Sequence, residues 1–106
     1  KDLIISGGFN IYPKEIELLL DEQEGILESA VIGVPHRDFG EAVVAIVVAD
    51  GSQKLIVAKL MAKLKPLVAR FKQPKLIFVQ NELPRNAMGK VQKNILRKQY
   101  QGVFKD

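Results

Sequence analysis

The stretch Leu83–Lys93 holds the side chain in this sequence that is best placed to do chemistry, the ammonium group of Lys90. Pro84 interrupts regular secondary structure, and Gly89, directly before the lysine, supplies the backbone freedom that a turn needs. The apolar spacing that resumes after Lys90 predicts a short helix. A long cationic side chain would therefore project from a turn that leads into a helix, where it can contact a phosphate or carboxylate oxygen. The alternative is an ordinary solvated lysine, because most surface lysines do nothing specific.

Two adjacent glycines, Gly7 and Gly8, mark a second candidate site near the start of the sequence. Short apolar segments flank them, so residues 2–11 are predicted to form a β-hairpin with the glycines in its turn. A tight turn is the commonest use of such a pair. The same pair also allows the backbone to come close to a ligand, because no side chain is in the way. The residues alone leave both interpretations open.

Several other kinds of site are excluded by the residue types. The sequence has no cysteine and a single histidine, His36, so neither a thiolate site nor a histidine-rich metal site can form, and we expect no metal ligands. His36 lies in a polar segment without an evident orienting partner, so we interpret it as a surface loop residue rather than a catalytic base. The sequence also lacks a Walker-type phosphate loop and a plausible nucleophile–histidine pair.

Hydrophobic periodicity and turn residues predict one domain of helices and strands over residues 1–106. The run Ala42–Val48 is apolar throughout and predicts a buried strand that pairs with residues 28–34. The other elements predicted after the hairpin are a helix that starts at Pro13 and is ended by Gly25, a strand over 27–34, a helix over 54–71 broken near Leu64–Lys65 by Pro66, a strand over 75–80, a helix over about 90–100 and a frayed end over 101–106. The fold class is therefore α+β, an N-terminal β-hairpin followed by a three-stranded sheet flanked by helices.

Charge is distributed unevenly between the two halves of the sequence. Residues 1–50 contain 3 Lys and Arg against 10 Asp and Glu, a net charge of −7, whereas residues 51–106 contain 13 against 2, a net charge of +11. Such a basic half usually forms a solvated surface, but it can also face an anionic ligand or a nucleic acid. Exposed aromatic residues are not interleaved with the lysines and arginines, so we expect no nucleic-acid partner. A basic module that binds nucleic acid or another partner, without an enzymatic role, is kept as the alternative.

Neither a transmembrane segment nor a signal peptide is expected. No apolar run approaches the roughly 20 residues that cross a bilayer. The sequence starts at Lys1 and runs at once into a strand-like segment, so we expect a fragment of a longer protein. We also expect that protein to be cytoplasmic.

Two motifs far apart in the sequence together resemble one known family. The first is Lys1–Glu17, which contains the segment Gly7–Pro13, and the second runs from Phe71–Pro74 through Leu83–Lys90. Both resemble the C-terminal domain of adenylate-forming acyl-CoA synthetases, the superfamily that also contains firefly luciferase and the adenylation domains of peptide synthetases. The resemblance covers nearly the whole chain. The segment Pro84–Lys93 is most similar to malonyl-CoA synthetases, with fatty-acyl ligases close to it.

The resemblance implies an ATP-dependent ligase whose large N-terminal adenylation domain is absent here. Members of the family convert a carboxylic acid and ATP to an acyl-adenylate and then transfer the acyl group to the thiol of CoA. ATP and Mg²⁺ would be bound mainly by the N-terminal domain. The C-terminal domain would be a mobile lid with two orientations, inactive when isolated. The acid would be malonate or a fatty acid.

The resemblance also implies roles for particular residues. In the first orientation Lys90 would contact the substrate carboxylate and the α-phosphate as the adenylate forms. In the second orientation the hairpin of Gly7–Gly8 and Phe9 would line the tunnel for CoA. Lys1 and Asp2 would form the hinge between the domains. A further interpretation places the basic half of the chain against the phosphates of the CoA nucleotide.

Overall fold

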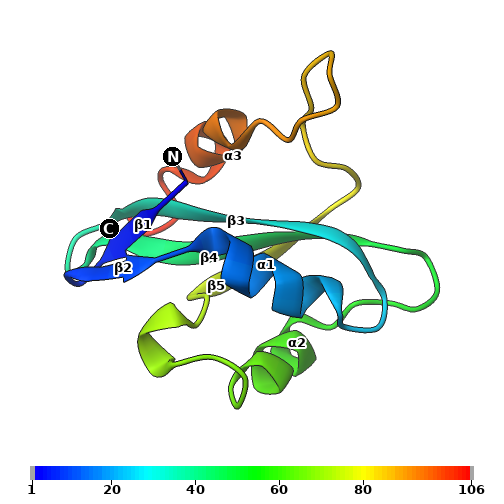
Figure 1. Ribbon diagram of the computed structural model, residues 1–106, viewed down its shortest axis with the longest axis horizontal. Coiled ribbons are helices and arrows are strands. Elements are labelled where there is room, and N and C mark those ends of the chain that lie inside the picture. Colours follow the sequence, from blue (N-terminus) through cyan, green and yellow to red (C-terminus); the bar gives the residue numbers. More distant parts are fainter. Residues whose placement is uncertain (1, 106) are drawn as a thin grey trace.

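A five-stranded mixed β-sheet forms the middle of the molecule, and helices cover both of its faces (Figure 1). The computed structural model describes residues 2–105. The strands are β1 (Ile4–Ser6), β2 (Phe9–Ile11), β3 (Ile26–His36), β4 (Gly40–Ala49) and β5 (Leu76–Gln80). The helices are α1 (Pro13–Asp21), α2 (Val57–Leu64) and α3 (Lys93–Tyr100), with a 3₁₀ turn, η1 (Arg70–Lys72), before β5. The α+β class is therefore confirmed.

The strand β4 pairs with three other strands and so organises the sheet. Along one edge it pairs antiparallel with β3 over nearly its whole length. The opposite edge is shared, because β5 pairs in parallel with residues 44–48 and β1 meets β4 only at the pair Ser6–Gly40. β2 extends the sheet beyond β1. The predicted hairpin therefore belongs to the same sheet as the three predicted strands.

Burial on both faces explains the unbroken apolar run in β4. The odd-numbered residues from Val43 to Val47 belong to a core under α1 and α2. The even-numbered residues from Val44 to Val48 belong to a second core under α3. Successive side chains of a strand point to opposite faces, so a strand covered on both sides must be apolar at every position. The prediction of a buried strand that pairs with residues 28–34 is confirmed.

Two helices on the first face are shorter than their sequence patterns indicated. α1 ends at Asp21, before the glycine that was expected to end it. The helix predicted over residues 54–71 contains only α2 and the separate 3₁₀ turn, and the break expected before Pro66 is confirmed. The side chain of Gln73, which follows η1, donates hydrogen bonds to three carbonyl groups at and beyond the end of α2. Pro66 ends the helix, and the Gln73 side chain then supplies a donor to carbonyl groups of the segment that follows.

The C-terminal end also differs from expectation. α3 begins at Lys93, because the residues before it form a turn rather than a helical start. The prediction of a frayed end is wrong for the described residues, since Phe104 packs against the core under α3. Its ring lies 4.9 Å from the ring of His36. None of the helices between residues 2 and 105 is long and apolar enough to cross a bilayer.

Candidate functional site

The lysine turn, which comprises residues 84–92, rises away from the sheet between β5 and α3 (Figure 1). An antiparallel bridge between Arg85 and Val91 closes its base. The Gln92 N–H donates to the Pro84 carbonyl at 2.9 Å, which joins the two ends of the turn. The turn is therefore a short hairpin-like excursion with a defined backbone.

Asn86 holds the backbone of Lys90 in place. Its Oδ1 atom accepts hydrogen bonds from the N–H groups of Met88 and Lys90, each at 2.9 Å. Its own N–H donates to the Lys90 carbonyl at 2.9 Å, and its carbonyl accepts from Gly89 at 2.9 Å. Gly89 has φ +83°, a conformation that side-chain-bearing residues rarely adopt. The sequence therefore places an asparagine and a glycine where this turn requires them.

Arg85 connects the turn to the sheet. Its Nη1 group donates to the Gly89 carbonyl at 2.6 Å, and its Nη2 group forms an ion pair with Glu28 of β3. One guanidinium group therefore braces the inside of the turn and anchors its base. The planar group with several donors suits such a double contact better than an ammonium group would.

The ammonium group of Lys90 is free to contact another molecule. The residue is exposed, and within residues 2–105 the side chain has no hydrogen-bond or ion-pair partner. Met88, two positions earlier, is 91% exposed. Lys90 also borders a shallow groove together with Asp2, Glu17 and Lys93. A fixed backbone thus presents an unpartnered cation, which is the arrangement that the sequence indicated.

The turn of the N-terminal hairpin needs glycine for its conformation alone. Gly7 and Gly8 have φ +56° and +85°, the positive values that both central residues of a tight type I′ hairpin turn adopt. A Cβ on Gly8 would meet nothing within 4 Å, and one on Gly7 would lie at ordinary distance from the Phe39 ring. The turn interpretation is therefore sufficient inside this domain. The space beside Gly8 also leaves its backbone open to a partner from outside.

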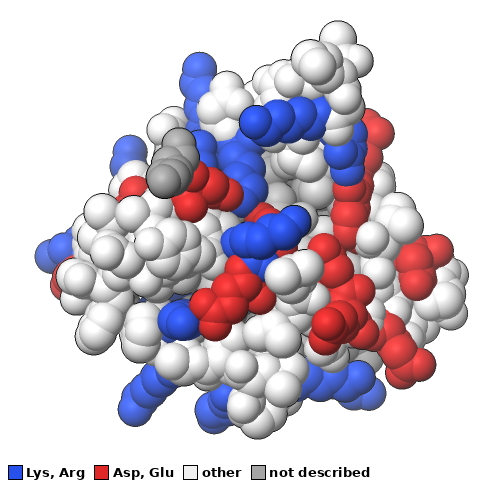
Figure 2. Space-filling model, viewed as in Figure 1, with Lys and Arg blue, Asp and Glu red and all other residues white. Residues whose placement is uncertain are grey.

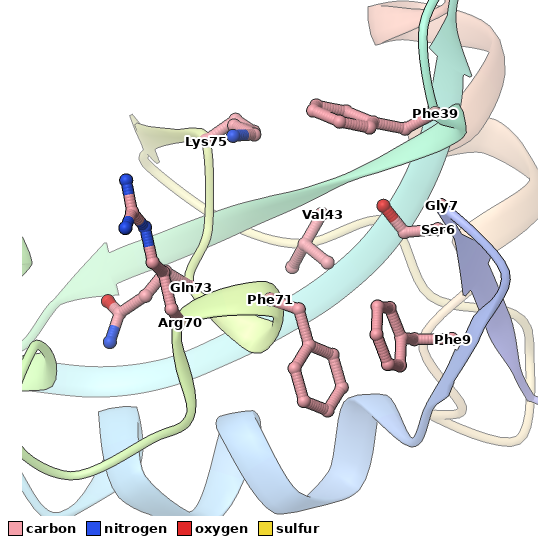
Figure 3. A pocket seen from close by; sticks show the side chains of 9 residues that line it. All are labelled: Ser6, Gly7, Phe9, Phe39, Val43, Arg70, Phe71, Gln73 and Lys75. Carbon is pink, nitrogen blue, oxygen red and sulfur yellow. The ribbon is translucent and has the colours of Figure 1, made fainter.

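A pocket of about 170 Å³ lies beside the hairpin, between β1, the start of β4 and η1 (Figure 3). Its lining combines aromatic rings with basic groups: Ser6, Gly7, Phe9, Phe39, Val43, Arg70, Phe71, Gln73 and Lys75. The rings of Phe9 and Phe71 stack with centroids 4.2 Å apart, and the Lys75 ammonium lies 4.8 Å from the Phe39 centroid. Apolar walls with cations beside them suit a ligand that has both an apolar part and negative charges.

The pocket wall is joined to α1 as well as to the hairpin. Lys72 forms an ion pair with Glu15 at 3.0 Å, and its ammonium lies 5.6 Å from the Phe71 ring. The Gly7 N–H donates to the Phe39 carbonyl at 2.9 Å. The hairpin, η1 and the β3–β4 connection are therefore held together as one unit. The sequence did not single out Phe39, Arg70 or Lys75, since their positions around a pocket depend on the tertiary structure.

The predicted site residues fall into two separate places. The groove beside Lys90 and the pocket beside Gly7 share no lining residue. The domain by itself therefore does not bring Lys90 and the hairpin together. Asp2, one of the two predicted hinge residues, borders the Lys90 groove and pairs with Lys93 of α3. The other, Lys1, lies outside the described residues.

His36 has a structural role and lines neither the groove beside Lys90 nor the pocket beside Gly7. It is the last residue of β3, so the prediction of a loop position is wrong. Its Nδ1 atom accepts a hydrogen bond from the Asp38 N–H at 3.1 Å, and its ring stacks on Phe39 at 4.6 Å. Within residues 2–105, no group of three or more His, Cys, Asp or Glu side chains is arranged to hold a metal ion.

The fold and these motifs define a family. The chain belongs to the family described as AMP-binding enzyme C-terminal domain, whose model matches residues 15–90. The match covers more than half of the chain and runs from α1 to the lysine turn, ending at Lys90. The resemblance stated from the sequence is therefore confirmed.

Three individual proteins show how similar this chain is to members of the family. The crystal structure of MatB from Rhodopseudomonas palustris is 53% identical, with a TM-score of 0.96 over 99% of this chain and 21% of that protein. The long-chain-fatty-acid–CoA ligase FadD13 of Mycobacterium tuberculosis is 46% identical over 94% of this chain and 20% of its own length. The indoleacetate–CoA ligase of Aromatoleum aromaticum is 46% identical over 92% of this chain and 19% of its own length. The chain thus spans about a fifth of the length of these relatives.

Proposed function

We propose that residues 1–106 are the mobile C-terminal domain of an ATP-dependent acyl-CoA ligase. The enzyme would form an acyl-adenylate from a carboxylic acid and ATP, release pyrophosphate, and transfer the acyl group to the thiol of CoA. Membership of the family and the similarity to named CoA ligases support this proposal. A cytoplasmic location and an N-terminal adenylation domain as partner belong to the same proposal.

The observation that carries the proposal is the unpartnered ammonium of Lys90 on a braced turn. In adenylate formation a carboxylate oxygen of the acid attacks the α-phosphorus of ATP, and pyrophosphate leaves. Lys90 would contact both the carboxylate and the α-phosphate and stabilise the negative charge between them. A flexible ammonium group suits this role, because it can bridge two anions and withdraw when the domain rotates.

The hairpin would serve the second half-reaction. Because the backbone of Gly8 is open on its outer side, the thiol-bearing arm of CoA could pass close to it without meeting a side chain. Gly7 and Phe9 of the same hairpin line the pocket, and Arg70 and Lys75 lie on the same lining. These two cationic side chains could pair with phosphates of the CoA nucleotide. This supports the interpretation that the basic half of the chain contacts CoA.

ATP and Mg²⁺ are proposed to be bound mainly by the N-terminal domain. The described residues offer no cluster of metal-binding side chains, so they do not fit a Mg²⁺ site, and no step is assigned to the metal within this domain. A crystal structure of MatB with ATP bound is 52% identical to this chain. That similarity supports ATP as the nucleotide.

The acid is proposed to be malonate or a fatty acid. The match to MatB, a malonyl-CoA synthetase, supports malonate, and the match to FadD13 supports a fatty acid. The relatives that are 46% identical nevertheless bear names of chemically different acids, a long-chain fatty acid and indoleacetate. Similarity in this domain therefore does not discriminate between acids. A screen of pyrophosphate release by the full-length enzyme over a panel of acids would identify the substrate.

The test of the proposal is Lys90→Ala in the full-length enzyme. We expect acid-dependent pyrophosphate release to fall by about 10²- to 10³-fold, because a preorganised charge contact is lost. Thioester formation from preformed acyl-adenylate and CoA should be nearly unchanged. Lys98→Ala, at an exposed lysine of α3, is the matched control. Equal loss in both half-reactions, or loss in neither, would contradict the role of Lys90.

A variant of the hairpin should show the opposite pattern. Gly8→Asn adds a side chain to a position with φ +85°, and asparagine tolerates this conformation better than most residues. We expect slower transfer to CoA with normal adenylate formation. Normal transfer to CoA in this variant would rule out the proposed role of the hairpin.

A further inference from the structure

We infer that Lys93 is a positioning residue that fixes how the chain enters this domain and thereby fixes the direction of Lys90. The inference rests on the proposed function, since the domain rotation that it serves belongs to that function. It concerns the N-terminal ion-pair network, which consists of Asp2, Glu17, Lys93 and Arg97.

The network joins three segments through one ammonium group. The Nζ atom of Lys93 lies 2.7 Å from Glu17 Oε2 of α1 and pairs with Asp2 before β1. Arg97 of α3 adds a second cation 3.4 Å from the other oxygen of Asp2. The side chains of Lys93 and Glu17 are only 16% and 14% exposed. Ion pairs that are partly shielded from water persist better than fully exposed ones, and removal of one partner leaves a carboxylate without compensation.

Glu17 connects this network to the core of the sheet. The same Oε2 atom accepts a hydrogen bond from the N–H of Val31 at 2.9 Å. Val31 is fully buried in β3. Lys93 therefore ties Asp2 to a point that cannot move without disturbing the sheet.

Asp2 needs such a tie because no strand pairing holds it. The register of β1 with β2 begins at Ile4, so Asp2 and Leu3 lie outside the sheet. Without the network, the backbone dihedrals of these two residues could absorb part of any rotation. With Asp2 held against α3, the dihedrals of Asp2 and Leu3 cannot take up that rotation. Hinges work in this way, with few residues taking up a large dihedral change.

Lys93 is also linked to Lys90, whose ammonium group must reach the substrate. Lys93 begins α3 only three positions after Lys90, and both border one groove with Asp2, Glu17 and Arg97. The chain entry and the lysine turn are thus tied to one helix. A rotation at the hinge would move Lys90 as part of a rigid body. Because misplacement of a catalytic group by about 1 Å can cost up to 10²-fold in rate, this rigidity bears on the reaction.

The experiment compares three variants of the full-length enzyme in both half-reactions, with malonate and a long-chain fatty acid as test acids. Lys93→Met removes the cation and keeps the length of the side chain. Lys93→Arg keeps the cation, and Asp2→Asn removes one partner at an exposed position. Lys98→Met is the matched control, since Lys98 is exposed on α3 and has no ion pair within residues 2–105.

We expect Lys93→Met to slow both half-reactions by roughly tenfold, because both orientations depend on a defined chain entry. Lys93→Arg should restore both rates, and Lys98→Met should leave them unchanged. Asp2→Asn should slow both half-reactions as well, and its combination with Lys93→Met should be no slower than Lys93→Met alone. A general loss of structure would not give this non-additivity. Hydrogen exchange of the segment 1–6 should become faster in Lys93→Met.

Two results would overturn the inference. The first is a Lys93→Met enzyme with both rates within twofold of the parent. The second is a slowed enzyme that Lys93→Arg does not rescue or whose loss adds to that of Asp2→Asn. Lys90→Ala, measured in parallel, separates this failure from failure of the proposed function, because it should stop adenylate formation whatever Lys93 does. If Lys90→Ala has no effect on adenylate formation, the proposed function and this inference both fail.

Discussion

The amide side chain of Asn86 determines how well Lys90 can be delivered. Two backbone N–H groups of the lysine turn donate to its Oδ1 atom, one of them from Lys90 itself. A turn that is ordered before it meets the substrate loses less conformational entropy when the ammonium group reaches its target. Asn86 is therefore expected to affect catalysis without touching the reacting atoms.

Replacement of this amide should slow the first half-reaction selectively. We expect Asn86→Ala in the full-length enzyme to lower adenylate formation by about tenfold, since the turn loses both hydrogen bonds to Oδ1. Asn86→Asp keeps an acceptor oxygen at the same place and should retain most of the rate. Single-turnover measurement of adenylate formation, alongside transfer from preformed adenylate, checks this.

Asn94→Ala is the control for Asn86→Ala, because Asn94 is an exposed asparagine at the start of the next helix. A rate for Asn86→Ala equal to that of this control would show that the hydrogen bonds of the turn do not matter for adenylation.

At the scale of elements, the end of α2 depends on a side chain nine residues away. The Nε2 group of Gln73 donates to the carbonyls of Leu64, Lys65 and Val68 at 3.3, 3.1 and 3.1 Å. These bonds hold the connection from α2 to η1, and η1 carries the Phe71 ring that stacks on the hairpin. The wall of the pocket therefore depends on a helix end that is capped from a distance.

Removal of this cap should loosen one segment rather than the whole domain. We expect Gln73→Leu to lower the local stability of residues 64–73 by about 1 kcal/mol, the usual net contribution of hydrogen bonds that are only partly shielded from water. Hydrogen exchange measured by mass spectrometry on the full-length protein should show faster exchange there and no change in β4. Gln99→Leu, at an exposed position of α3, is the control. Unchanged exchange at 64–73 would contradict the capping role.

At the scale of the whole molecule, the fold mixes the two oppositely charged halves of the sequence. The ion pairs Lys72–Glu15, Arg85–Glu28, Lys93–Glu17 and Arg97–Asp2 each join a base of the second half to a carboxylate of the first. Figure 2 shows acidic and basic side chains lying next to one another in the middle of one face. Part of the charge asymmetry along the sequence is thus compensated in space, which weakens the case for a basic nucleic-acid-binding surface.

The chain should accordingly show little affinity for nucleic acids. We expect no change in the fluorescence anisotropy of labelled DNA or RNA at low micromolar protein and about 50 mM salt, conditions under which phosphate-binding proteins bind strongly. A basic protein that is known to bind DNA would serve as the positive control. Binding that weakens steeply with added salt would restore the alternative of a nucleic-acid-binding module.

The sequence by itself determined the features that depend on neighbouring residues. The apolar run of β4, the glycine turn at Gly7–Gly8 and the turn before Lys90 were all legible, because periodicity and turn chemistry act over a few residues. The helix lengths were only partly legible, because Pro66 indicated the end of α2 whereas α1 ends at Asp21, before the glycine that was expected to end it. The family was indicated by two motifs, each made of residues that lie close together in the sequence.

Only the tertiary structure decided which distant groups meet. Lys93 and Asp2 are 91 positions apart, and no local pattern predicts that they pair. The same holds for the meeting of β1 with β4 at Ser6–Gly40 and for the ring stack of Phe9 on Phe71. Such contacts depend on how the sheet is ordered and on which faces the helices cover. Packing of the two cores fixes both, and the positions of the charged side chains follow from that packing.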